Sequence, residues 1–325
     1  MAILITGGAG YIGSHTLMAL LNRNEEVIVL DNLSKGHEYA VKGGKFYCGD
    51  LRDEELLDKV FKQNEIEDII HFAAYSLVGE SVKDPISYYN NNVKGTINLL
   101  YYMKKYGVKN IVFSSTAAVY GEPEHIPILE NDSTIPTNPY GESKLAIERL
   151  LNWANNAGDI NYIALRYFNA AGAYEGGSIG EDHSPETHLI PIILEVALGK
   201  RDKIIIFGED YDTPDGTCIR DYIHVMDLAE AHILALDKLK REGRSGIYNL
   251  GNGKGFSVRE VIEKAKEVTG RDIPIEIGDR RLGDPAILVA SSEKAKKELN
   301  WNPKYDDLGR IIEDAWRWHY TKNIS

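Results

Sequence analysis

The 325-residue sequence predicts an α/β fold in which a doubly wound parallel sheet of the Rossmann type is followed by a smaller mixed C-terminal domain. Apolar runs of strand length alternate with amphipathic helical stretches through the first half of the chain, as in consecutive βαβ units. Runs such as Ile-Val-Phe at 111–113 are apolar on both faces, which is typical of strands buried between two layers of helices. A glycine-rich turn follows the first apolar run and opens the first helical pattern.

The strand-like runs of the first half cover residues 3–6, 27–31, 45–47, 68–72, 110–115 and 162–166. The helical patterns between them cover residues 13–22, 53–63, 86–106 and 140–156. Because each helix separates two strands by enough chain for a crossover, these strands are expected to run parallel.

The regular alternation of strand-like and helical runs ends after Asn169. Two long connections, 172–188 and 208–220, are rich in glycine and acidic residues, and loops of such length are usually functional. Beyond them we expect helices over 189–199, 225–240, 258–269 and 307–320. Apolar runs at 204–207 and 247–250 could return to the main sheet as strands. The predicted domains, 1–169 and 170–325, therefore meet at a soft boundary.

The composition restricts the class of protein. The net charge is −12, from 37 basic and 49 acidic residues, which argues against nucleic acid or an anionic membrane as the main partner. No apolar run approaches the thickness of a bilayer, and the first residues show no basic segment or cleavage site. Cys48 and Cys218 form no disulfide or metal pattern, which favours the reducing cytoplasm.

Nine histidines are scattered without metal-ligand spacing, and His183 and His188 fall on one loop. We therefore expect no metal site and do not favour a metal-dependent hydrolase.

The glycine-rich turn predicts a dinucleotide site. Gly7, Gly10 and Gly13 allow a tight turn and let backbone N–H groups approach a pyrophosphate at a helix N-terminus. Asp31 ends the second strand, where a carboxylate accepts the ribose hydroxyls of adenosine and repels a 2′-phosphate. NAD is therefore favoured over NADP. Asp50 and Leu51 follow the third strand and fit an adenine pocket, although Gly-Asp is also common turn chemistry.

A second pattern predicts acid–base chemistry on a carbinol carbon. Tyr140 and Lys144 are four residues apart and share a helix face, where an ammonium group lowers the pKa of a nearby phenol. Thr116 follows a strand that ends at the same edge of the sheet and supplies a hydroxyl there; the alternative, less favoured, is that it only satisfies backbone groups at the strand end. Tyr101 and Lys105 have the same spacing but lie inside a long helix, where a packing or solvated face is the better interpretation.

With these residues in place, the chain resembles the extended short-chain dehydrogenases/reductases, and within them the UDP-hexose 4-epimerases. The resemblance runs from end to end of the chain. It rests on residues 7–13, 31–33, 71–73, 88–93, 114–121, 140–144, 166–169, 215–217, 220–227 and 280–284.

The resemblance implies interconversion of UDP-glucose and UDP-galactose through a transient 4-keto sugar and enzyme-bound NADH, with NAD tightly held and not consumed. It implies that Tyr140 takes the proton of the sugar O4, that Lys144 lowers the pKa of Tyr140 and binds the nicotinamide ribose, and that Thr116 hydrogen-bonds O4. It also implies a homodimer formed through the helices at 86–106 and 140–156.

By the same resemblance, further residues are expected to contact the cofactor or the UDP-sugar. The expected cofactor residues are Gly7, Gly10, Tyr11, Ile12, Gly13, Asp31, Asn32, Asp50, Leu51, Phe72, Ala73, Ala74, Asn91, Ser114, Tyr140, Lys144 and Phe168. The expected substrate residues are Thr116, Tyr140, Asn169, His188, Leu189, Phe207, Arg220, Arg281, Asp284 and Leu288. Of these, Arg220 and Arg281 would bind the diphosphate, because guanidinium groups bind phosphate in a fork.

Four positions depart from the pattern of the relatives, and one of them, Thr116, stands where many have Ser but keeps the hydroxyl. Ser76 stands where some relatives have Lys near the cofactor, and His188 stands where several have Asn. Leu288 stands where enzymes strict for UDP-glucose tend to have Tyr. Because a smaller side chain leaves volume at the C2 substituent of the sugar, we hypothesise that UDP-N-acetylglucosamine and UDP-N-acetylgalactosamine are also substrates.

Three alternatives were weighed against this interpretation. A UDP-glucuronate 4-epimerase shares the same cycle and stays open. Dehydratases of this group usually carry an acidic residue soon after the Ser/Thr, whereas Thr116 is followed by Ala117 and Ala118. A non-catalytic NAD-sensing protein would need the glycine turn but not the set of Tyr140, Lys144 and Thr116.

Overall fold

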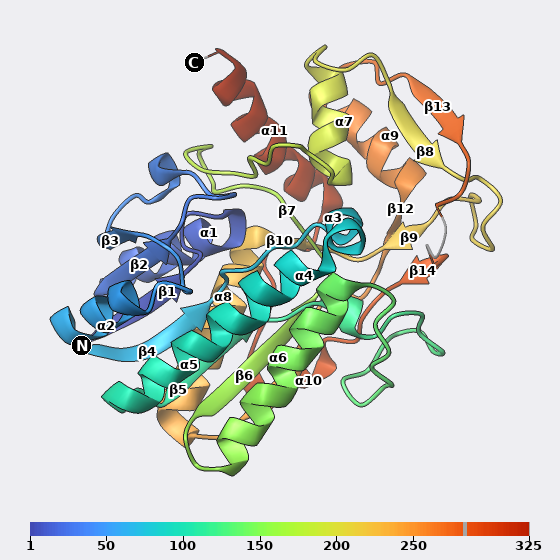
Figure 1. Cartoon of the computed structure of the whole chain (residues 1–325). Coiled ribbons are helices and arrows are strands. Elements are labelled where there is room, and N and C mark those ends of the chain that lie inside the picture. The colour runs from blue at the N-terminus through green and yellow to red at the C-terminus, as the bar shows by residue number, and fades with distance from the viewer. Residues whose placement is uncertain (282–284, 325) are drawn as a thin grey trace.

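The computed structural model describes residues 1–281 and 285–324. Its centre is a seven-stranded sheet, parallel throughout, with the strand order β11-β6-β5-β4-β1-β2-β3 (Figure 1). The strands are β1 (Ala2–Thr6), β2 (Val27–Asp31), β3 (Lys45–Cys48), β4 (Ile66–His71), β5 (Asn110–Ser114), β6 (Asn161–Tyr167) and β11 (Gly246–Leu250). The predicted doubly wound parallel sheet is therefore confirmed.

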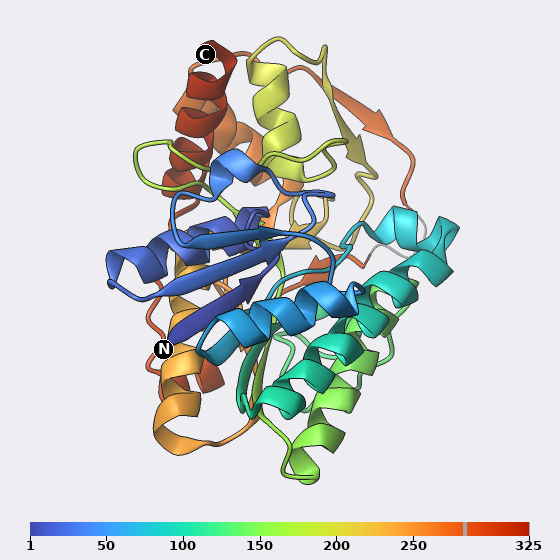
Figure 2. The same ribbon diagram turned by 60° about the vertical axis from the view of Figure 1, so that its left-hand side comes forward.

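Helices cover both faces of this sheet (Figures 1 and 2). One layer contains α2 (Glu54–Gln63), α5 (Gly95–Tyr106) and α6 (Pro139–Asn156), and the other contains α1 (Tyr11–Asn22), α8 (Val225–Glu242) and α10 (Glu293–Leu299). Alternate residues of β1 face the two layers, since Ile3 and Ile5 belong to one buried cluster and Ala2 and Leu4 to the other. The sheet is thus buried on both sides, as its apolar strands predict.

The predicted helix over 86–106 is helical throughout but not uniform. It begins as α4 (Pro85–Tyr88), widens into a π-helical turn over Tyr89–Lys94 and continues as α5. From this wide turn the Asn92 side chain accepts from the Tyr75 N–H of the preceding loop at 2.8 Å and donates to Ser143 Oγ of α6 at 3.0 Å. This is a typical use of a π turn, because such turns recur at functional sites.

The smaller half of the molecule packs around its own apolar cluster. Its helices are α7 (Leu189–Ala197), α9 (Val258–Thr269) and α11 (Leu308–Ile324), beside a two-stranded parallel sheet of β8 (Ile204–Phe207) and β13 (Ile275–Gly278) (Figures 1 and 2). Helix α9 begins with a capping box between Ser257 and Glu260 and ends at Gly270, which has φ 63°.

Short strands connect the two halves. β9 (Ile219–Arg220) pairs antiparallel with β12 (Phe256–Ser257) and parallel with β14 (Ile287–Leu288), while β10 (Tyr222–His224) pairs with β7 (Asn169–Ala171). The remaining elements are α3 (Val78–Lys83) and two short 3₁₀ helices, Glu38–Ala40 and Ala117–Val119.

The two candidate strands of the second half take different places. β11 extends the main sheet by pairing with β6, whereas β8 pairs with β13 and does not join the main sheet. Helices α8 and α10 also pack on the main sheet. A boundary near residue 170 therefore stays a prediction, since the chain crosses between the halves more than once.

Among the helices of the described residues, none has the length and apolar character needed to cross a bilayer.

Candidate active site

A cavity of about 1360 Å³ opens at the carboxyl ends of the parallel strands and extends toward the smaller half. Doubly wound sheets bind ligands at this edge, where the strand order reverses beside β1. The described residues that line it include every predicted cofactor residue: Gly7, Gly10, Tyr11, Ile12, Gly13, Asp31, Asn32, Asp50, Leu51, Phe72, Ala73, Ala74, Asn91, Ser114, Tyr140, Lys144 and Phe168.

The glycine turn fits a dinucleotide because side chains are sterically excluded from it. Gly7 has φ 75°, and a Cβ atom on it would lie 2.5 Å from the backbone nitrogen of Ala73. A Cβ atom on Gly13 would lie 2.1 Å from the carbonyl oxygen of Gly7. The turn therefore presents bare backbone to the cavity directly before α1, which is the environment that a pyrophosphate requires.

Asp31 is held in place at the end of β2. Its carboxylate accepts from the backbone N–H of Ala9 at 2.9 Å and from that of Leu33 at 2.8 Å. Burial raises the pKa of Asp31, and these two hydrogen bonds oppose the rise. The carboxylate thus links the glycine turn to β2 while it lines the cavity.

Asp50 has a partner that the sequence did not suggest. The Arg52 guanidinium donates from Nε to Asp50 Oδ1 at 2.7 Å and holds the pKa of that carboxyl well below its usual range. Asn32 Nδ2 also donates to Asp50, at 2.8 Å. Asp50 lines the cavity just after β3, so Arg52 and Asn32 fix the orientation of a lining carboxylate.

Tyr140, Lys144 and Thr116, here called the Tyr140 corner, all line the cavity. Asn138 caps α6 by accepting from the Gly141 N–H at 2.9 Å, so Tyr140 lies in the first turn of the helix. Burial raises the pKa of Tyr140, and a hydrogen bond with the Thr116 side chain lowers it. Thr116, which follows β5, therefore favours the phenolate form of Tyr140.

Lys144 lies buried one helical turn beyond Tyr140. Its ammonium group donates to the carbonyl oxygen of Ser114 at 2.7 Å and stands 4.9 Å from the centre of the Phe113 ring. Burial lowers the pKa of Lys144 to about 7, against the attraction of Glu148. In this structure the group that lowers the pKa of Tyr140 is Thr116, whereas the sequence predicted that Lys144 would lower it.

The comparison with protein families decides the family of this chain. A model described as the NAD dependent epimerase/dehydratase family matches residues 3–251. The chain belongs to the NAD dependent epimerase/dehydratase family.

Relatives within the epimerase/dehydratase family resemble the chain over its whole length. A UDP-glucose 4-epimerase from Halalkalibacterium halodurans is 64% identical over 98% of this chain and 96% of its own. The crystal structure of UDP-glucose 4-epimerase from Bifidobacterium longum in complex with NAD+ and UDP is 43% identical, with a TM-score of 0.94 over 99% of each chain. The UDP-Glc/GlcNAc 4-epimerase from Campylobacter jejuni is 46% identical, with a TM-score of 0.87 over 98% of this chain and 99% of its own.

In this epimerase/dehydratase family member, a buried polar network lies next to the Tyr140 corner, further along α6. Glu148, one turn after Lys144, accepts from Arg166 Nε at 2.9 Å and from the hydroxyl of Ser115. Arg166 also donates to Tyr120 Oη at 2.9 Å, and Tyr120 donates to Asn249 at 2.6 Å. The network joins α6 to β6 and β11 and so fixes the helix that carries Tyr140.

The structure places some of the predicted substrate residues at the cavity and others away from it. Thr116, Tyr140, Asn169, His188, Arg220, Arg281 and Leu288 line the cavity. Leu189 and Phe207 are not among the described lining residues, because Leu189 packs on the core of the smaller half and Phe207 lies under the Arg281 guanidinium, 3.9 Å from its ring centre. Asp284 lies outside the described residues.

Some lining residues were missed by the sequence analysis. Lys35, on the loop after β2, and Lys83, at the end of α3, add positive charge to the lining of the cavity. Gly36 packs on the glycine turn, since a Cβ atom there would lie 2.6 Å from the carbonyl carbon of Ala9. A lysine beside a glycine, four residues after Asp31, is the signal that could have identified this loop.

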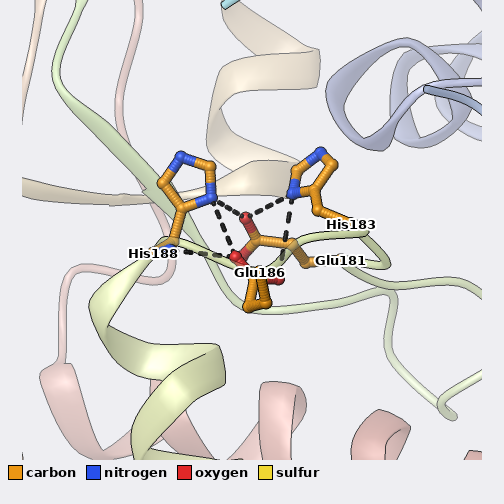
Figure 3. Close-up of side chains that lie close together, drawn as sticks. All are labelled: Glu181, His183, Glu186 and His188. Atoms are coloured by element: carbon orange, nitrogen blue, oxygen red, sulfur yellow. Dashed lines mark hydrogen bonds and ion pairs between the residues drawn. The ribbon is translucent and has the colours of Figure 1, made fainter. Parts of the chain in front are cut away.

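The 172–188 connection brings four charged or titratable side chains together at the wall of the cavity (Figure 3). Glu181, His183, Glu186 and His188 place one ligand atom each within 4.8 Å of one another. Although burial would lower the pKa of His188, the carboxylates of Glu181 and Glu186 raise it to about 10. His188 Nδ1 thus faces these carboxylates, at 2.7 Å from Glu181 Oε1. The sequence analysis saw no ligand spacing here.

Proposed function

We propose that this protein is a UDP-glucose 4-epimerase that interconverts UDP-glucose and UDP-galactose with tightly bound NAD. The observation that carries the proposal is the position of the Tyr140 corner. It lines the same cavity as the glycine turn and Asp31 on one side and as Arg220 and Arg281 on the other. Relatives that carry this activity in their names are similar to the chain from end to end.

In the proposed reaction, Tyr140 accepts the proton of the C4 hydroxyl while Thr116 hydrogen-bonds the same oxygen. The Thr116 hydroxyl already lowers the pKa of Tyr140, which favours the phenolate that this step needs. Lys144 adds a buried amine beside the cofactor end of the cavity. NAD, when bound, supplies the reversible hydride acceptor for C4. After the 4-keto sugar has rotated to present its other face and C4 has regained the hydride, Tyr140 returns the proton to O4 while Thr116 hydrogen-bonds that oxygen.

Arg220 and Arg281 are proposed to hold the diphosphate about which the sugar turns. Both line the cavity, and Arg281 is braced against the Phe207 ring at 3.9 Å. Fixed guanidinium groups suit a ligand with two phosphates on a protein whose net charge is −12.

Leu288 supports a broader choice of sugar. It lines the cavity from β14 and packs on the cluster formed by Val119, Tyr120 and Leu145, close in sequence to the Tyr140 corner. A leucine leaves more room than a tyrosine at this position, so we propose that UDP-N-acetylglucosamine and UDP-N-acetylgalactosamine are substrates too. The similar enzyme from Campylobacter jejuni is named for both UDP-Glc and GlcNAc.

We further propose that the protein acts in the cytoplasm as a homodimer. Large apolar and aromatic side chains are exposed along the helices of one layer, including Ile86 (79%), Tyr101 (62%) and Trp153 (71%). Exposed apolar surface of this kind supports burial against a second copy of the chain. Light scattering on the purified protein should give twice the 36.4 kDa mass of one chain, and a Trp153→Glu variant should shift toward monomer.

The reaction is tested on protein purified without added cofactor. UDP-galactose and UDP-N-acetylgalactosamine are incubated separately with the protein, and the products are followed by proton NMR. We expect both sugars to be converted to their C4 epimers. Conversion of UDP-galactose alone would keep the epimerase and remove the broad specificity. If neither is converted even with added NAD, the assignment fails and UDP-glucuronate becomes the substrate to examine.

A further inference from the structure

The cluster on the 172–188 connection has a composition and a geometry that the proposed reaction does not use. We propose that Glu181, His183, Glu186 and His188 form a binding site for one divalent transition-metal ion, with Zn²⁺ as the best fit (Figure 3). The site would be structural: the ion ties the connection together where it forms the wall of the cavity. This inference does not depend on the proposed function.

The spacing of the ligand atoms matches a small tetrahedral site. His183 Nδ1 lies 3.2 Å from Glu181 Oε1 and 3.9 Å from Glu186 Oε2. His188 Nδ1 lies 2.7 Å from Glu181 Oε1 and 3.3 Å from Glu186 Oε1. Ligand atoms about 2.1 Å from a tetrahedral zinc ion are separated by about 3.4 Å, so small side-chain rotations complete the site.

The donor set selects among metals. Two imidazole nitrogens and two carboxylate oxygens suit Zn²⁺ and similar borderline ions, whereas Mg²⁺ and Ca²⁺ prefer oxygen ligands alone. Two carboxylates also balance the charge of a divalent cation. Figure 3 shows the rings of His183 and His188 approaching the carboxylates of Glu181 and Glu186 from two sides, which leaves the four donors convergent.

Two further observations point to a ligand. The carboxylate side chains of Glu181 and Glu186 are each only 5% exposed, and both point toward the histidines. His183 Nδ1 is buried and makes no hydrogen bond of normal geometry to any of the described residues. Buried carboxylates beside a buried nitrogen that lacks a well-formed hydrogen bond are costly unless a cation or a proton joins them.

The backbone around the cluster is fixed from outside the loop. Trp318 of α11 donates from its indole nitrogen to the Glu181 carbonyl at 3.1 Å. Gly180 lets that ring approach, since a Cβ atom there would lie 2.3 Å from the indole. Asp182 is anchored by Lys322 and by the Tyr39 hydroxyl, the latter at 2.6 Å. The ligands are therefore held on a backbone that helix α11 positions, as a preorganised site requires.

The rival explanation is that protons take the place of the metal, so that a charged His188 satisfies the two carboxylates. The two explanations differ in metal content. The holoprotein is purified without chelator, and its bound metals are measured by mass spectrometry. We expect about one zinc per chain, and a tetrahedral Co²⁺ absorption band after removal of zinc with a chelator and addition of Co²⁺ alone.

The variant His183→Ala tests the ligand set. We expect at least a tenfold weaker affinity for Zn²⁺, because one of four ligands is lost. Glu186→Gln, which keeps the shape of its side chain, gives a second measurement if His183→Ala folds poorly. His125→Ala is the matched control, since His125 is an exposed loop histidine outside the lining of the cavity.

Each outcome decides the proposal. Stoichiometric zinc in the wild type and in His125→Ala, with loss in His183→Ala or Glu186→Gln, supports the site. A wild type that holds less than about a tenth of an equivalent and shows no Co²⁺ band overturns it in favour of the protonated cluster. Zinc that stays bound to both ligand variants would also overturn it.

Discussion

Tyr140, Lys144 and Thr116 stand on regular elements of the main sheet, whereas the facing side of the cavity comes from connections and two-residue strands. Tyr140 lies in the first capped turn of α6, and Thr116 follows β5. Arg220 and Leu288 belong to the short strands β9 and β14, and His188 ends a long connection. A site of this kind holds the reacting groups rigidly and lets the wall vary, so the two regions should respond differently to mutation.

The largest effect is expected at the rigid region. Tyr140→Phe removes the proton acceptor, so the turnover number should fall about 1000-fold, while NAD remains bound. Turnover is measured with UDP-galactose, and bound cofactor is measured on the denatured protein. Tyr101→Phe is the matched control, because Tyr101 has the same spacing to a lysine but is 62% exposed on α5. Equal losses of turnover in Tyr140→Phe and Tyr101→Phe would contradict the role of Tyr140 as the proton acceptor.

A smaller effect with a pH signature is expected at Thr116. Thr116→Val removes the hydrogen bond that lowers the pKa of Tyr140, and turnover should fall about 30-fold, as for a hydrogen bond to a charged group. The reaction needs the phenolate, so the rate rises with pH, and loss of this bond should move the rise to higher pH. Thr116→Ser keeps the hydroxyl and should keep both rate and profile. An unshifted profile in Thr116→Val would contradict the assigned role.

On the facing wall, the effect should appear in substrate binding. Arg281→Met removes a guanidinium braced on Phe207, and KM for UDP-galactose should rise about tenfold while the turnover number changes little. Arg280→Met is the control, because the Arg280 guanidinium pairs with Asp210 and is not among the described lining residues. A fall in turnover with unchanged KM would place Arg281 with the reacting groups instead.

The smallest effect should be a change of selectivity. Leu288→Tyr fills volume near the sugar, and its preference for UDP-galactose over UDP-N-acetylgalactosamine should rise about tenfold relative to wild type, as for a change in pocket size. The ratio of kcat/KM for the two substrates measures this. If the wild type and Leu288→Tyr are equally inactive on the N-acetylated sugar while both act on UDP-galactose, the broad specificity is wrong.

The regular region was also the more predictable from sequence. The strand at 27–31 and the helix at 258–269 have the predicted bounds, because period and capping residues are local properties of the chain. The glycine turn and the pair Tyr140 and Lys144 were predicted for the same reason, because they follow from spacing within single elements. Thr116 was predicted from its place at the end of a strand.

The facing wall depends on contacts between distant residues. The runs 204–207 and 247–250 look alike as apolar segments. Only the second, which forms β11, pairs with β6 in the main sheet, whereas the first forms β8 and pairs with β13. The π turn at 89–94 has the sequence pattern of an ordinary helix, and the contacts that Asn92 makes from it reach Tyr75 and Ser143, 17 and 51 residues away in sequence. The His–Glu cluster has no period, and Trp318, which positions it, lies 137 residues away in sequence.

The position of β11 also bears on how the chain is made. As the protein leaves the ribosome, β6 remains an open edge until residues 246–250 have been synthesised. The buried face beside it is incomplete until Leu228, Tyr248 and Trp301 arrive. An unpaired strand edge and exposed apolar surface favour aggregation. A nascent chain that stops near residue 170 thus has every residue of the Tyr140 corner and six of the seven strands, but the edge of β6 and part of one face of its sheet are still uncovered.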